Sequence, residues 1–243
     1  MIEAKQLVKR FRDKKRGEVR AVDHVSFSCR PGEIYGLLGA NGAGKTTTLR
    51  MLATILEPSE GTAIVAGFDV RKDPQKVRSC VGFLSTATAL YGRLTAIEMV
   101  QYFGRLHGLD EPTLARRIDA IFERLEMNEF RDRRCDNLST GMKQKVSIAR
   151  TLVHDPSVMV FDEPTVGLDV MAARTIAGFI RECRDQGKTV VFSTHVMSEV
   201  EKLCDHIGII HGGKLLAEGT LADLRRTFGM QDLEDIFVKV VEP

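Results

Sequence analysis

The sequence predicts an α/β domain built on a largely parallel β-sheet. Short, continuously apolar runs alternate along the chain with longer segments of helical periodicity, a pattern typical of strands covered by helices. Three of these runs end in polar residues that can bind or react. Because parallel strands present their carboxyl ends at one edge of a sheet, we expect these residues to form one shared site.

Length and composition limit the class of protein. The chain has 243 residues, 43% hydrophobic and 28% charged, as expected for a globular protein of one large domain or two small ones. The formal net charge of +2 gives no reason to expect a nucleic acid as the main partner. No apolar run approaches the roughly 20 residues that span a bilayer. Composition therefore argues against an integral membrane protein.

The cysteines indicate a reducing compartment. They are five in number, widely spaced, and contain no C-x-x-C pair: Cys29, Cys80, Cys135, Cys183 and Cys204. An odd, scattered set is not the framework of a secreted disulfide-bonded domain. The amino terminus has no signal-peptide pattern either. We expect reduced thiols in a cytosolic protein.

The expected strands and helices follow in chain order. The first 35 residues are predicted to form short strands and turns. The later strands are the apolar runs Ile34 to Leu38, Val158 to Phe161, Val190 to Phe192 and Ile207 to Ile210. Between about Leu94 and Leu152 the chain is predicted to be mainly helical, with a capping box at Thr95 and Glu98 and an amphipathic helix over Thr113 to Arg124.

A phosphate-binding loop follows the first of these apolar runs. The stretch from Gly39 to Thr46 has the spacing G-x-x-x-x-G-K-T between a strand and a helix. Its glycines let backbone N–H groups surround phosphate oxygens, and the helix that begins there favours an anion. Lys45 is predicted to reach the β- and γ-phosphates, and the Thr46 hydroxyl to bind Mg²⁺. The alternative is a glycine-rich turn with an exposed lysine.

The predicted nucleotide-binding residues of this loop form one continuous set. They are Gly39, Asn41, Gly42, Ala43, Gly44, Lys45, Thr46 and Thr47.

Two carboxylates and a histidine follow later strands. Asp162 and Glu163 end the apolar run that begins at Val158. We expect Asp162 to hold Mg²⁺ and Glu163 to act as the base on an attacking water, with Lys45 assisting catalysis. His195 ends the next run and is predicted to contact the γ-phosphate. The alternatives are that the two carboxylates cap the next helix and that the histidine is structural.

A second motif decides between the classes of phosphate-loop protein. Leu138-Ser139-Thr140-Gly141-Met142 lies between the phosphate loop and the carboxylates. Read alone, it is a helix start with Ser139 as the N-cap. A phosphate loop by itself fits kinases, GTPases and many ATPases.

In this order the motifs resemble those of the ATP-binding-cassette (ABC) ATPases, from Ile2 to about Thr220. Gly39 to Thr46 resembles the Walker A loop, Val158 to Glu163 the Walker B strand, Leu138 to Met142 the L-S-G-G-Q signature, Gly167 to Asp169 the D-loop, and His195 the switch histidine. The resemblance argues against a phosphate-loop kinase. It implies a P-loop NTPase (RecA-like) core with a mainly parallel sheet, an N-terminal antiparallel β subdomain and an inserted α-helical subdomain.

The resemblance also implies domain limits. Residues 1–220 are expected to form the ATPase domain, with the helical subdomain at about 87–152, and residues 221–243 a short C-terminal extension.

The resemblance further implies an ATP-dependent head-to-tail dimer. Each ATP would lie between the Walker loop of one subunit and the signature of the other, where Ser139 and Gly141 would bind the γ-phosphate. Asp169 would contribute to the same nucleotide site. Phe11 stands where the family usually has an aromatic residue that stacks on adenine; its alternative is a core aromatic.

The chain departs from the family at one metal position. The family usually has a glutamine that touches Mg²⁺ and the membrane partner, and here that position falls near Thr86, a further candidate magnesium ligand. Loop sequences such as Gly82 to Ser85 and Leu90 to Thr95 resemble the ATPase subunits of sodium-exporting (NatA-type) ABC transporters.

These similarities imply a motor subunit at the cytoplasmic face of the membrane. It would bind ATP and Mg²⁺ and energise export, of Na⁺ or of a drug, lipid or polysaccharide, through a separate permease. Thr86 to Tyr102, with Leu90, Tyr91, Leu94 and Met99, would form part of the docking surface, unless those apolar residues are core. The other alternative is an ABC ATPase that acts on ribosomes or DNA; such relatives generally carry two cassettes or a coiled-coil insertion.

Overall fold

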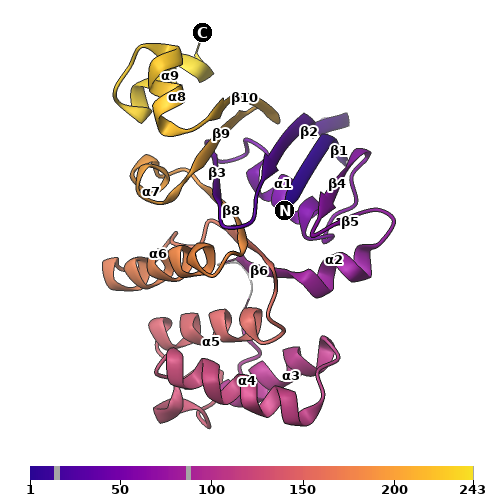
Figure 1. Cartoon of the computed structure of the whole chain (residues 1–243), viewed down its shortest axis with the longest axis vertical. Coiled ribbons are helices and arrows are strands. Elements are labelled where there is room, and N and C mark those ends of the chain that lie inside the picture. The colour runs from indigo at the N-terminus through magenta and orange to yellow at the C-terminus, as the bar shows by residue number, and fades with distance from the viewer. Residues whose placement is uncertain (14–16, 86–88, 243) are drawn as a thin grey trace.

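A computed structural model describes residues 1–13, 17–85 and 89–242 of the chain. Two sheets occupy the upper and middle parts of Figure 1, and a group of helices lies at the opposite end from the carboxyl terminus. This confirms the predicted α/β class, with a mainly parallel sheet, an antiparallel sheet and a helical insertion. Thr86 lies outside the described residues.

The central sheet has six strands in the order β10-β9-β3-β8-β7-β6. Five of them run parallel, and β10 at one edge is antiparallel to β9. Their bounds are Ile34–Leu38 (β3), Val81–Ser85 (β6), Val158–Asp162 (β7), Thr189–Thr194 (β8), His206–His211 (β9) and Lys214–Gly219 (β10). Strands β3, β7 and β8 are buried throughout, which explains why they appear as uninterrupted apolar runs.

The second sheet is antiparallel, with the order β2-β1-β4-β5. Its strands are Ile2–Asp13 (β1), Gly17–Cys29 (β2), Glu60–Val65 (β4) and Phe68–Asp69 (β5). The prediction of short strands in the first 35 residues is wrong here, because β1 and β2 are 12 and 13 residues long. Irregular pairing at Ala4, Leu7 and Lys9 shifts the register, so the alternation expected of one long strand is broken in the sequence.

The helical insertion contains α3 (Ala96–Leu106), α4 (Glu111–Arg124) and α5 (Thr140–Leu152), with short 3₁₀ turns at Asn128–Phe130 and Cys135–Asn137. The capping box at the start of α3 is confirmed: Glu98 N–H donates to Thr95 Oγ1, and Thr95 N–H donates to Glu98 Oε2. These helices share a separate apolar core that includes Met99, Leu114 and Phe122. The predicted docking role of Met99 is therefore wrong, since this side chain is fully buried.

The remaining helices are α1 (Lys45–Leu52), α2 (Pro74–Cys80), α6 (Val170–Asp185), α7 (Met197–Leu203), α8 (Leu221–Phe228) and α9 (Leu233–Val241). Helices α8 and α9 lie at the top of Figure 1, beside β10. They share one apolar core with β9, through Leu224, Ile236 and Ile209. Within the described ranges, no helix combines the length and apolar character needed to cross a bilayer.

A pair of stacked histidines lies where the helical insertion meets β6. The rings of His107 and His154 are parallel, with centroids 3.6 Å apart. His154 Nε2 donates to the Val81 carbonyl oxygen at 3.1 Å, because a carbonyl can only accept. Burial, and then the adjacent His107, lower the pKa of His154 to about 4. The folded protein therefore holds His154 neutral.

This histidine makes stability depend on pH. As pH falls from 6.5, the ordinary pKa of histidine, the unfolded chain gains a proton that folded His154 does not accept until about pH 4. The free energy of unfolding should therefore fall by about 3 kcal/mol as the pH drops through this window. This loss should be absent in His154→Gln, whose amide can donate a hydrogen bond to the Val81 carbonyl oxygen without titrating. Urea unfolding at pH 7 and pH 4 measures it, with His211→Gln at an exposed site as control. Equal pH dependence in wild type and His154→Gln would contradict the expectation.

Candidate functional site

The phosphate loop, residues 39–44, joins β3 to α1 as the sequence predicts. Gly44 adopts φ +107°, and a Cβ there would lie 2.5 Å from the Ala21 carbonyl oxygen, so only glycine fits. The loop borders a hollow of about 370 Å³ at the start of α1. Its lining residues are Ala21, Asn41, Gly42, Ala43, Gly44, Lys45, Thr46, Thr47 and Glu163. The structure thus brings most of the predicted loop residues together with Glu163.

Lys45 is held inside this hollow by oxygen atoms. Its side chain is only 4% exposed, and Nζ donates to the carbonyl oxygens of Gly39 at 2.7 Å and Ala40 at 3.1 Å. Nζ also lies 3.0 Å from Glu163 Oε1. The alternative of an exposed lysine on a glycine-rich turn is therefore wrong. A buried ammonium beside loop N–H groups is suited to an anionic ligand.

Asp162 ends β7 and faces the phosphate loop. Its Oδ1 accepts hydrogen bonds from Thr46 Oγ1 at 2.8 Å and from Ser193 Oγ at 2.9 Å. Ser193 stands opposite Asp162 in the adjacent strand β8, so the sheet register itself makes this contact. A carboxylate beside a hydroxyl is a hard oxygen donor set of the kind that Mg²⁺ prefers, and these residues fit that ion.

Glu163 occupies a backbone conformation that non-glycine residues rarely adopt, with φ +47°. Its Oε1 lies 3.4 Å from His195 Nδ1 as well as beside Lys45. Burial tends to raise the pKa of Glu163, but Lys45 and His195 together outweigh it and hold the pKa below its ordinary value. The carboxylate is therefore ionised at neutral pH and can accept a proton.

The alternative in which Asp162 and Glu163 cap the next helix is wrong. Helix α6 starts at Val170, and its N-cap is Asp169, whose Oδ1 accepts hydrogen bonds from the N–H groups of Met171 and Ala172, both at 2.9 Å. In this chain the carboxylate of Asp169 stabilises a helix end. It is not among the residues that line the phosphate-loop hollow.

The signature motif lies at the start of α5. Ser139 is the N-cap of this helix, and its Oγ accepts a hydrogen bond from Met142 N–H at 3.3 Å. Ser139 and Gly141 are both exposed. Neither lines the hollow at the phosphate loop of the same chain. The structure therefore does not bring these two residues to the phosphate-loop hollow of their own chain.

Phe11 lies on β1 and is 40% exposed, so the alternative of a core aromatic is wrong. Lys9 Nζ lies 5.4 Å from the centre of its ring. Stacking of Phe11 on adenine remains a prediction.

Two residues of the site, Ala21 and Ser193, are not predicted as binding residues from the sequence. No sequence signal marks Ala21, because its role is only to border the loop. Ser193 could have been found from its place at the end of a buried strand, next to Thr194 and His195.

Comparisons with known proteins show sequence similarity to ATP-binding proteins of ABC transporters. The family model described as ABC transporter matches residues 22–166. The ABC transporter ATP-binding protein NatA of Bacillus subtilis (strain 168) is 45% identical over 98% of this chain and 97% of its own length. The probable multidrug ABC transporter ATP-binding protein YbhF of Escherichia coli (strain K12) is 38% identical over 93% of this chain and 38% of its own length.

Solved structures of ABC transporter ATP-binding subunits have the same fold as this chain. The ATP-binding subunit of an ABC transporter superposes with a TM-score of 0.87 at 29% identity, over 99% of both chains. A dimeric bacterial ABC transporter cassette, MJ0796, superposes with a TM-score of 0.80 at 25% identity, over 90% of this chain and 98% of its own.

Proposed function

Because the chain belongs to the ABC transporter family, we propose that it binds and hydrolyses ATP to drive export through a separate permease. It is an ATP hydrolase of the ABC type, within a family that includes exporters. The observation that best supports the proposal is the meeting of four groups at one hollow: the phosphate loop, the buried Lys45 ammonium, the Asp162–Thr46 pair and the ionised Glu163.

The contacts of Lys45 suggest how hydrolysis begins. The ammonium group of Lys45 pairs with Glu163. A triphosphate in the hollow competes for the same ammonium group and weakens this pair. Lys45 is one of the two neighbours that lower the pKa of Glu163, so a weaker pair would raise this pKa and make Glu163 a stronger base toward the attacking water. His195, which lies beside Glu163, is proposed to contact the γ-phosphate.

Mg²⁺ would be held by Thr46 and Asp162, two oxygen donors of the site that are hydrogen-bonded to each other. When bound, the ion would neutralise charge that develops on the β- and γ-phosphates. Ser193 would keep Asp162 oriented through its own hydrogen bond. Thr86, the further candidate ligand, lies outside the described residues.

The proposed active form is a head-to-tail dimer. Ser139 and Gly141 are exposed and separate from the chain's own phosphate loop, as a contact to ATP on a partner copy requires. MJ0796, a relative by fold and sequence, is a dimeric cassette. With the γ-phosphate present, charge-assisted hydrogen bonds would join the copies, and hydrolysis would weaken them. Asp169 and Phe11 are proposed contributors to the same nucleotide site.

A groove between α1, β6 and α3 is the proposed docking surface for the permease. It has a volume of about 530 Å³ and combines apolar Ile55 and Phe103 with the cations Arg50 and Arg78. This lining suits an amphipathic helix that carries an acidic residue. Of the predicted docking residues, Leu90 and Leu94 pack against the core of the helical insertion.

Tyr91 stays a proposed docking residue, although it does not line this groove. It is 57% exposed, and its ring lies edge-on to Tyr102, with centroids 5.8 Å apart.

The proposed cargo is Na⁺, because the loops Gly82 to Ser85 and Leu90 to Thr95 resemble those of sodium-exporting (NatA-type) ATPase subunits, and NatA of Bacillus subtilis matches nearly the whole chain. A drug is the second candidate, since YbhF is described as a probable multidrug transporter protein. We further propose a peripheral location at the cytoplasmic face of the membrane. Residues 1–220 are proposed as the ATPase domain and 221–243 as an extension whose helices share its core.

Reconstitution with a membrane permease encoded beside it tests the proposal. The pair, purified together and placed in vesicles, is expected to export Na⁺ only when ATP and Mg²⁺ are supplied, as measured with a sodium-sensitive dye. Vesicles with Lys45→Ala give the background. ATP hydrolysis with no sodium flux would reject Na⁺ as cargo. Failure to associate with any membrane subunit, with retained binding to ribosomes or DNA, would reject the motor function.

A further inference from the structure

Glu199 bridges two segments that flank the proposed catalytic residues. It lies in the first turn of α7, four residues beyond His195. Its Oε1 accepts a hydrogen bond from Thr165 Oγ1 at 2.5 Å, and its Oε2 accepts one from Thr194 Oγ1 at 2.7 Å. Thr165 follows Glu163 by two residues, and Thr194 immediately precedes His195. One half-buried carboxylate therefore joins both segments.

The Glu163 segment needs such support because its backbone is strained. A glutamate at φ +47° persists only where its surroundings fix it. On its amino-terminal side, Glu163 N–H donates to Ser193 Oγ at 3.1 Å. On its carboxyl-terminal side, the turn continues into Thr165, which Glu199 holds. The two anchors together restrain the residue on both sides.

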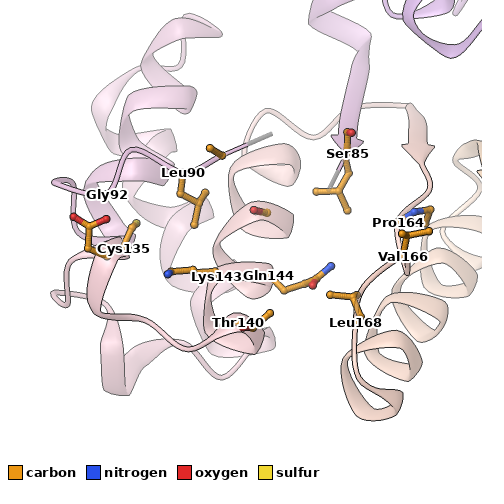
Figure 2. Close-up of a pocket in the computed structure, with 14 residues that line it drawn as sticks. Ser85, Leu90, Gly92, Cys135, Thr140, Lys143, Gln144, Pro164, Val166 and Leu168 are labelled. Carbon is orange, nitrogen blue, oxygen red and sulfur yellow. The ribbon is translucent and has the colours of Figure 1, made fainter. Parts of the chain in front are cut away.

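Packing from the helical insertion gives this segment little restraint. Pro164, Val166 and Leu168 line a cavity of about 440 Å³ that separates them from α5. Figure 2 shows this space, with Gln144 extending from α5 toward Leu168 across it. The carboxylate of Glu199 on α7 adds two hydrogen bonds to the one from Glu163 N–H to Ser193, and all three tie this segment to the end of β8 or to the helix that follows it.

We propose that Glu199 is a positioning residue for ATP hydrolysis. By accepting hydrogen bonds from Thr165 and Thr194, it fixes the positions of Glu163 and His195 relative to each other at the phosphate-loop hollow. Glu199 acts through Glu163 and His195 and is not itself among the residues that line the hollow. This inference rests on the proposed ATP hydrolysis at this site.

Steady-state kinetics of the full chain tests the inference. In Glu199→Ala, kcat is expected to fall about tenfold while KM for ATP and the Kd for ADP change less than twofold, because the phosphate loop is untouched. Glu201→Ala is the matched control: it lies on the same helix and pairs with Arg225 at 3.1 Å. An unchanged kcat in Glu199→Ala, or an equal loss in Glu201→Ala, would overturn the inference.

A second pair of variants guards against a merely structural effect. Thr165→Val removes one hydroxyl and leaves Glu199 in place, whereas Thr165→Ser keeps the hydrogen bond, so only the valine variant should lose kcat. In a Glu163→Gln background, Glu199→Ala should cost clearly less than the tenfold loss expected in wild type, since the part of its effect that passes through Glu163 is already lost. An additive loss would overturn the inference. A wild-type protein without ATPase activity would instead refute the proposed function, and this inference with it.

Discussion

Glu163→Gln is expected to lower the rate of ATP hydrolysis by about 10²- to 10⁴-fold, the range that general-base catalysis contributes. The glutamine amide cannot accept a proton from water, although its size and position remain those of the glutamate. Nucleotide binding should persist and even strengthen, because Lys45 no longer has an ion-pair partner that competes with phosphate. Phosphate release in a single turnover measures the first effect, and ATP binding at equilibrium measures the second.

The same variant should accumulate the ATP-bound dimer. Sedimentation with ATP is expected to show a dimer for Glu163→Gln and a monomer when ATP is omitted. Adding Ser139→Ala should weaken this dimer while leaving ATP binding by the monomer largely intact, because Ser139 is remote from its own phosphate loop. Normal turnover in Glu163→Gln would show that Glu163 is not the base.

Lys45→Ala is expected to weaken ATP binding by roughly 100-fold, so that no binding is seen at ordinary ATP concentrations. The variant removes a buried ammonium whose hydrogen bonds to phosphate each contribute about 1.5–3 kcal/mol, and a 1.4 kcal/mol loss is tenfold in affinity. Titration with a fluorescent ATP analogue measures the affinity.

Two controls separate binding from folding in this variant. Lys45→Met keeps most of the side-chain volume and should lose affinity to the same extent, which attributes the effect to charge. The thermal midpoint shows whether the protein remains folded, since Lys45 also donates to the carbonyl oxygens of Gly39 and Ala40. Wild-type affinity in a folded Lys45→Met would remove Lys45 from the phosphate site.

Local signals predicted much of the fold. Strand β3 was expected at Ile34 to Leu38 and lies there, because a fully buried strand is a continuous apolar run. The capping box at Thr95 was found because a helix start depends on residues three positions apart. The antiparallel strands β1 and β2 were underestimated, since their bulges interrupt the alternation that marks a long strand.

The sequence by itself determined which chemical groups this protein has and, through motif order, which family it resembles. The tertiary structure alone decided how those groups meet. Thr46 and Asp162 are 116 residues apart yet hydrogen-bonded, and Glu199 joins Thr165 from 34 residues away. The physical reason is that strand and helix signals extend over a few residues, whereas contacts between strand ends depend on sheet order. Likewise the strain at Glu163 and the burial of Met99 arise from packing that no local pattern records.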